Sequence, residues 1–166
     1  MIHRPMQASG RAHMWISFSP DLGHWGSHRI LMEARLGAWW DAQRIGLSPQ
    51  PIETEKGWLL LYHGVRVTAA GCLYRLGVAL LDLDDPTTVL LRGDEWVFGP
   101  EEQYERLGDV GDVVFPCGAT IGDDGDTLNL YYGGADTVLC LARASIRELL
   151  DLLEARGRPC DKAPYI

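Results

Sequence analysis

The stretch that decides the fold is Gly57-Trp58-Leu59-Leu60-Leu61-Tyr62-His63-Gly64, which is apolar almost throughout and ends at a glycine. In a β-strand, successive side chains point to opposite faces, so Tyr62 lies on one face and His63 on the other. His63 therefore ends an apolar face, just before Gly64. A histidine at the end of such a face is commonly a structural residue, so a ligand-binding role for His63 needs further support.

The same pattern occurs a second time along the chain. Leu59 to Gly64 and Leu128 to Gly133 both read L-x-L-Y-[HY]-G. Each copy precedes another apolar run, Val78 to Leu83 after the first and Thr137 to Ala142 after the second. Recurring strand pairs are typical of the blades of a β-propeller, although a sandwich of ordinary hairpins gives a similar match.

Short apolar runs separated by Gly, Pro and Asp predict an antiparallel, all-β domain. One helix is expected, at about 145–156, because Ser145 and Glu148 form a capping box and Gly157 offers a stop. The apolar runs are His13 to Phe18, Gly57 to His63, Cys72 to Leu83, Thr88 to Leu91, Val113 to Phe115, Thr127 to Tyr132 and Thr137 to Ala142.

Composition limits the possible functions. The 166 residues are 46% hydrophobic and 23% charged, which fits one soluble domain with a single core. A net charge of −8 would repel nucleic acid and anionic membranes. No run approaches the roughly 20 apolar residues of a membrane helix, and no signal peptide is evident. The four scattered cysteines are interpreted as reduced, which favours the cytoplasm.

Motifs along nearly the whole chain follow one order and spacing, and together they resemble glycoside hydrolase family 130, the β-mannoside phosphorylases and their hydrolytic relatives. The motifs are His3-Arg4-Pro5, Ser19-Pro20-Asp21-Leu22, His24-Trp25-Gly26, Trp40-Asp41, Arg44-Ile45-Gly46, Pro51-Ile52-x-Thr54, Tyr62-His63-Gly64-Val65, Tyr74-Arg75, Leu80-Leu81-Asp82-Leu83, Val113-Val114-Phe115-Pro116 and Tyr131-Tyr132-Gly133-Gly134-Ala135-Asp136-Thr137.

The resemblance implies a five-bladed β-propeller, of which this chain would form an incomplete one of about three blades plus the C-terminal helix. Members of the family are roughly twice this length. Their general acid is an aspartate in the N-terminal part, before the motifs matched here. The resemblance therefore assigns a catalytic role to no residue of this chain, and a partner that is either a separate N-terminal half or a second copy is expected.

Five binding residues follow from the resemblance. Arg4, His63 and Tyr74 match phosphate-binding positions, Arg44 stands where the family usually has a phosphate-binding lysine, and Asp136 matches a carboxylate that holds mannosyl hydroxyls. Phosphate needs convergent cations, which Arg4, Arg44 and His63 would supply, and a carboxylate can accept paired hydroxyls. No cofactor is implied, only inorganic phosphate as co-substrate.

Each assignment has a plainer alternative. Isolated arginines are commonly solvated or stacked on aromatic rings, and Asp136 could cap a turn. Asp112 stands where relatives commonly have asparagine, which adds negative charge near the expected anion site, and Gly134 replaces an alanine. The acidic clusters around Asp84 and Asp124 lack the spacing of a calcium loop and are interpreted as turns, so no metal site is expected.

Three functions remain open from sequence. The leading one is phosphorolysis of β-1,4-mannosides to α-mannose 1-phosphate, with inversion, by the complete fold. The second is hydrolysis, in which water replaces phosphate and a carboxylate acts as base. The third is a non-catalytic sugar-binding module. The retention of Arg4, Arg44 and His63 favours the phosphorylase.

Overall fold

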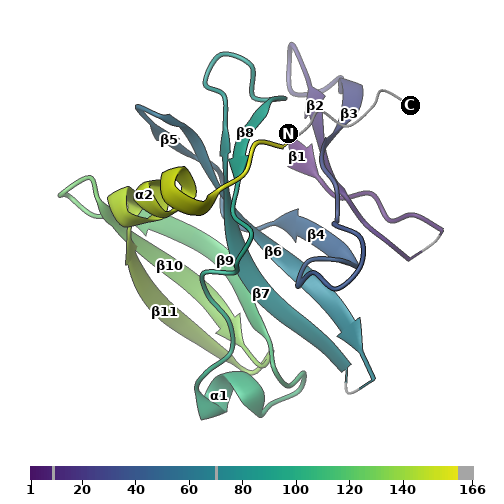
Figure 1. Ribbon diagram of the computed structural model, residues 1–166, viewed down its shortest axis with the longest axis vertical. Coiled ribbons are helices and arrows are strands. Elements are labelled where there is room, and N and C mark those ends of the chain that lie inside the picture. Colours follow the sequence, from purple (N-terminus) through teal and green to yellow (C-terminus); the bar gives the residue numbers. More distant parts are fainter. Residues whose placement is uncertain (9, 70, 161–166) are drawn as a thin grey trace.

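The computed structural model describes residues 1–8, 10–69 and 71–160, which form three antiparallel sheets and a C-terminal helix (Figure 1). The first sheet has the order β1-β2-β3, the central sheet β4-β6-β7-β8 with β5 beside β6, and the third β11-β10-β9. The strands are β1 Ile2–His3, β2 Met14–Phe18, β3 Gly26–Met32, β4 Arg44–Leu47, β5 Ile52–Thr54, β6 Gly57–Thr68, β7 Gly71–Leu81, β8 Val89–Arg92, β9 Val114–Ile121, β10 Thr127–Gly134 and β11 Val138–Ser145, and the helices are α1 Gln103–Arg106 and α2 Ile146–Arg156.

The hairpin of β6 and β7 is the centre of the molecule, because both of its faces are covered. Leu60 and Tyr62 on one face pack with side chains of the first sheet. Leu59 and Leu61 on the other face pack with side chains of β10 and with α2. This explains why the strand that begins at Gly57 is apolar on both sides.

The sequence repeat corresponds to equivalent positions in two sheets. Leu59 to Gly64 lies in β6 and Leu128 to Gly133 in β10, and each of these strands pairs along its whole length with the next one in the chain. The expected all-β character and the C-terminal helix are confirmed. The N-cap of α2 is Ser145, whose side chain accepts a hydrogen bond from the backbone N–H of Glu148 at 3.1 Å.

Five elements were not expected from the sequence: β1, β3, β4, β5 and α1. Strand β3 reads Gly-Ser-His-Arg-Ile-Leu-Met, and only its last two residues are buried. Such a strand shows no alternation of apolar and polar residues. Helix α1 spans four residues and depends on Glu105, which accepts hydrogen bonds from the backbone N–H groups of Glu101 and Glu102 and from the hydroxyl of Tyr132.

A buried carboxylate joins the first sheet to the central one. Asp41 is fully buried and accepts hydrogen bonds from Arg35 at 2.7 Å, Arg92 at 2.6 Å and the Tyr62 hydroxyl at 3.0 Å. Arg92, at the end of β8, also donates to the carbonyl oxygen of Glu33, beyond β3. Two guanidinium groups thus neutralise one carboxylate where the two sheets meet.

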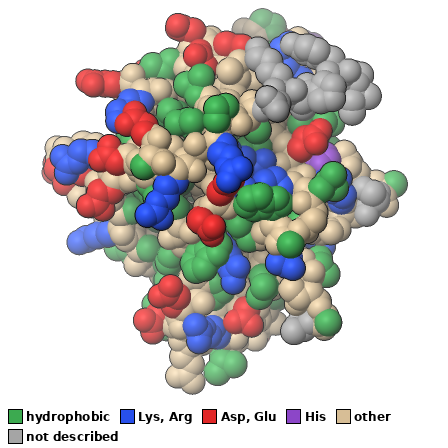
Figure 2. Space-filling view, in the orientation of Figure 1, with side chains coloured by type: hydrophobic (Ala, Val, Ile, Leu, Met, Phe, Trp, Pro, Cys, Tyr) green, Lys and Arg blue, Asp and Glu red, His purple; other side chains and the backbone are tan. Residues whose placement is uncertain are grey.

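The surface carries acidic and basic side chains interspersed with hydrophobic ones (Figure 2). Leu139 and Leu141 of β11 and Tyr131 of β10 share one face of the third sheet and are 73%, 48% and 40% exposed. All four cysteines are free. Among the described residues, no helix has the length and apolar character needed to cross a membrane.

The Asp41 network yields a stability prediction. Asp41→Asn should lower the free energy of unfolding by about 3–5 kcal/mol, because it leaves the buried guanidinium of Arg92 without its counter-charge. Asp151→Asn is the control, since Asp151 is an exposed partner of Lys56 at 3.7 Å and should matter by less than about 0.5 kcal/mol. Urea denaturation measures both. Equal, small effects of the two substitutions would show that the buried charges are not coupled as described.

Candidate functional site

The N-terminal segment holds Arg4 at the junction between the first and central sheets. The ring of the preceding His3 is fixed by the Ser17 hydroxyl, with 2.7 Å between Nε2 and Oγ, and His28 contacts the same hydroxyl through Nδ1 at 2.6 Å. The N-terminal amine donates to the carbonyl oxygen of Ser17 at 2.8 Å. These contacts anchor β1, and Arg4 follows it directly.

Arg4 reaches across to His63 in the central sheet. Its Nη1 lies 2.9 Å from Nε2 of His63, although 59 positions separate the two residues. Gly46 of β4 pairs with His63 of β6, so position 46 faces the same contact. A Cβ atom at Gly46 would lie 2.5 Å from Cε1 of His63 and 2.9 Å from Nη1 of Arg4. A glycine is therefore required here, because any side chain would displace one partner.

The electrostatic state of His63 differs from the sequence-based expectation. Burial lowers the pKa of His63 to about 4, the charge of Arg4 adds to the shift, and the backbone of Leu47 opposes it. The ring is therefore neutral at pH 7. Of the three residues expected to be cations, Arg4, Arg44 and His63, the histidine carries no charge at this pH. Since a guanidinium can only donate, Nε2 of His63 accepts, and the ring proton lies on the buried Nδ1.

Tyr74 and Phe115 line the other side of His63. The ring centroids of His63 and Tyr74 are 6.4 Å apart and nearly parallel, and that of Phe115 lies 4.7 Å from His63. Tyr74 comes from β7 and Phe115 from β9, so the central and third sheets both contribute. Phe115 was not identified as a site residue from sequence, although it lies in the Val-Val-Phe-Pro motif that carried part of the resemblance.

Arg44 lies on the same face of the central sheet as His63. It is two residues before Gly46 on β4 and pairs with Val65, which is two residues after His63 on β6. Its Nε atom is buried and makes no hydrogen bond to any residue that the structure describes. A buried N–H without a partner is costly, which makes this donor a candidate for an anion ligand.

Asp136 lies in the neighbouring sheet, in the turn between β10 and β11. Ala135 and Asp136 both have left-handed backbones, with φ of 46° and 52°. The backbone N–H of Ala135 donates to the carbonyl oxygen of Val113, and Asp136 itself is exposed. Strand β10 approaches the cluster two residues before the turn, where Gly133 pairs with Phe115. His63 thus lies against both Arg4 and Tyr74, whereas Asp136 lies in a turn of the third sheet.

The acidic residues outside this cluster have separate roles. Asp82 and Asp124 accept hydrogen bonds from backbone N–H groups two and three residues further along, as side chains that shape turns do. Asp112 is exposed, has φ of 59°, and lines a cavity with Arg75 and Arg106, away from His63.

Comparison with known proteins gives consistent results. A family model described as beta-1,4-mannooligosaccharide phosphorylase matches residues 1–155. The chain is 44% identical to a beta-1,2-mannobiose phosphorylase of Listeria innocua, over 95% of this chain and 43% of the relative. It is 39% identical to a beta-1,4-mannooligosaccharide phosphorylase of Ruminococcus albus, over 87% of this chain and 42% of the relative.

A solved structure of a beta-1,2-mannobiose phosphorylase from Listeria innocua, in complex with beta-1,2-mannobiose, superimposes on this chain with a TM-score of 0.85. The sequence identity is 46%, and the match covers 93% of this chain and 42% of that one. The chain thus spans less than half the length of these relatives.

The low pKa of His63 predicts a pH-dependent stability. The unfolded chain takes up the His63 proton near pH 6.5 and the folded chain only near pH 4, so stability is lost as the pH falls through this window. The loss attributable to His63 should reach about 3 kcal/mol. Urea denaturation from pH 7 to pH 4 should therefore show a shallower decline for His63→Gln than for the wild type. Parallel curves would contradict the assignment, since contributions from other histidines are common to both proteins.

Proposed function

The chain belongs to glycoside hydrolase family 130, and on this basis we propose that it binds inorganic phosphate and the mannosyl unit of a β-mannoside for phosphorolysis. The observation that carries the proposal is the contact between Arg4 and His63, with the unpaired Nε of Arg44 on the same face. Two guanidinium groups at one site suit an oxyanion, because their planar N–H donors match its oxygens.

In the proposed reaction, a phosphate oxygen attacks the anomeric carbon as the glycosidic C–O bond breaks. The leaving oxygen takes a proton from an acid, and inversion yields α-mannose 1-phosphate and a shortened saccharide. Arg4 and Arg44 hold the phosphate, His63 and Tyr74 complete its pocket, and Asp136 accepts hydroxyl hydrogens of the mannosyl unit. The family pattern places the acid outside these residues, so turnover requires it to come from elsewhere in a complete five-bladed propeller, of which the three sheets are blades.

The exposed apolar face of the third sheet supports association with further structure. Tyr131, Leu139 and Leu141 lie together there, and such faces are usually covered in a working protein. A separate N-terminal half or a second copy of the chain would cover it, and light scattering distinguishes either from a monomer.

The linkage of the substrate is part of the proposal. The sequence motifs suggested β-1,4-mannosides, but the relatives include phosphorylases named for β-1,2-mannobiose as well as for β-1,4-mannooligosaccharides. Both linkages are therefore test substrates. A non-catalytic sugar-binding module differs from both in one respect, because it has no reason to couple sugar binding to phosphate.

The first test is calorimetric titration with β-1,2- and β-1,4-mannobiose, with and without phosphate. One of the two sugars should bind more tightly when phosphate is present. Arg4→Ala should weaken phosphate binding roughly tenfold to a hundredfold, because charge-assisted hydrogen bonds are lost, and should affect sugar binding less. Arg156→Ala, on the exposed end of α2, is the control. Equal losses of both ligands in Arg4→Ala would indicate unfolding, and binding that is independent of phosphate would indicate a lectin.

The second test concerns Asp136. Asp136→Ala should abolish mannoside binding while changing the free energy of unfolding by no more than about 1 kcal/mol, because the side chain is exposed. Asp136→Asn is the matched variant, since asparagine tolerates the left-handed backbone but carries no charge. Both variants should lose sugar affinity if the carboxylate holds hydroxyls. A large stability loss in the alanine variant alone, with sugar binding intact in both, would make Asp136 a structural turn residue.

A further inference from the structure

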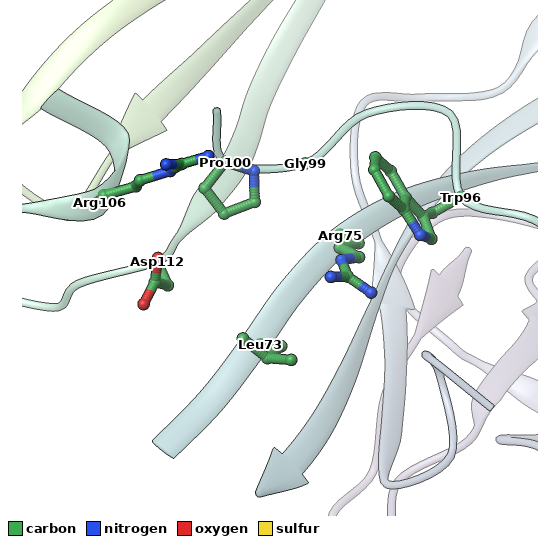
Figure 3. A pocket seen from close by; sticks show the side chains of 7 residues that line it. All are labelled: Leu73, Arg75, Trp96, Gly99, Pro100, Arg106 and Asp112. Carbon is green, nitrogen blue, oxygen red and sulfur yellow. The ribbon is translucent and has the colours of Figure 1, made fainter. Parts of the chain in front are cut away.

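A cavity with a volume of about 220 Å³ lies beside the free edge of β7. Figure 3 shows Arg75, Leu73 and Trp96 on one side of it, and Arg106, Pro100 and Asp112 on the other. Gly99 also lines it. Strand β8 pairs with β7 only from Ala79 onward, and Phe98 bridges to Leu76, so β8 does not reach the edge of β7 at Leu73 to Arg75.

This cavity is distinct from the cluster around His63. Tyr74, which contacts His63, and Arg75, which lines the cavity, are neighbours on β7, so their side chains point to opposite faces of the sheet. Arg75 pairs with Gly64, whereas Tyr74 pairs with Val65. The cavity and the His63 cluster therefore lie on opposite faces of β7.

The cavity is lined by two arginines and one carboxylate, so its side chains carry a net positive charge. Neither Arg75 nor Arg106 forms an ion pair or a side-chain hydrogen bond with another described residue. The carboxylate next to Arg106, that of Glu105, is already bonded to Tyr132 and to backbone N–H groups. Two such arginines at one cavity are unusual in a protein whose net charge is −8.

The position of each cation is set by its surroundings. The guanidinium carbon of Arg75 lies 4.7 Å from the centroid of the Trp96 ring. Stacking uses the face of a guanidinium and leaves its in-plane N–H donors for a ligand. Arg106 ends α1, which Glu105 anchors, and the carbonyl oxygen of Glu105 accepts from the N–H of Val113, next to Asp112.

We propose that this cavity is a second anion site that takes a phosphorylated monosaccharide. Arg75 and Arg106 bind the phosphate group, and the exposed carboxylate of Asp112 accepts a sugar hydroxyl. Leu73 and Pro100 provide the apolar wall against which a sugar ring packs. The volume exceeds what a bare phosphate fills and lies below that of pockets for drug-sized ligands. The ligand class follows from these groups alone and does not rest on the proposed phosphorolysis.

The test uses the full chain with Arg4→Ala, which weakens phosphate binding at the first site and leaves the cavity intact. Calorimetric titration of this protein with mannose 1-phosphate should still show one site. Adding Arg75→Ala or Arg106→Ala should weaken that binding at least about tenfold, whereas adding Arg156→Ala should not. Circular dichroism checks folding, and the exposed Arg106 provides a second variant should Arg75→Ala disturb Trp96.

Inorganic phosphate and unphosphorylated mannose are the comparison ligands. Phosphate should bind at least about fivefold more weakly than mannose 1-phosphate, and mannose should not bind measurably. Asp112→Asn should tighten the binding of inorganic phosphate, because it removes a negative charge from the cavity. Absence of binding in the Arg4→Ala protein, or unchanged binding after Arg106→Ala, would overturn the site. Equal affinity for phosphate and mannose 1-phosphate would overturn the sugar as part of the ligand. Neither outcome bears on the coupling of mannoside and phosphate in the wild type.

Discussion

The buried carboxylate of Asp41 is the interaction on which the relation between the first two sheets depends. It holds Arg35, Arg92 and the Tyr62 hydroxyl within hydrogen-bond distance, and these groups come from the loop after β3, from β8 and from β6. A charge in this position is costly unless all of its partners are present, so the elements that carry them must assemble together. The apolar contacts between the two sheets stabilise their packing but do not fix their relative orientation, because the hydrophobic effect is non-directional. The hydrogen bonds of Asp41 are directional and restrict that orientation.

The same network determines where the candidate site can form. Trp40, next to Asp41, lies against β6 and β7, where a Cβ at Gly64 would be 2.4 Å from its ring and one at Gly77 would be 2.6 Å away. Gly64 follows His63 directly, so the face of β6 opposite to His63 is closed by Trp40 and Asp41. His63 is thereby directed toward Arg4 and the third sheet, and it has little room to rotate. The orientation of His63 thus depends on Trp40 and Asp41, which pack on the opposite face of β6.

Much of this could be predicted from the sequence, and the failures have physical reasons. The apolar strand at Gly57 to Gly64, its repeat in β10 and the cap at Ser145 are local patterns, and the structure contains all three. Strand β3 was missed because its sequence shows no alternation of apolar and polar residues and only its last two residues are buried. The charge of His63 was misjudged because its pKa depends on burial by residues from three sheets, which no local pattern reveals.

The neutral state of His63 changes how an anion would be bound. A guanidinium has five N–H donors, and His63 occupies one of them on Arg4, which leaves the others for phosphate. The histidine then acts as a fixed acceptor that orients the arginine, at no cost in charge repulsion between the two. A protonated His63 would repel Arg4 and could no longer accept its hydrogen bond. Gly46 fits this arrangement, because it permits a direct bond between two side chains that a methyl group would separate. In this arrangement Arg4 carries the positive charge, and His63 fixes the orientation of the Arg4 guanidinium through their hydrogen bond.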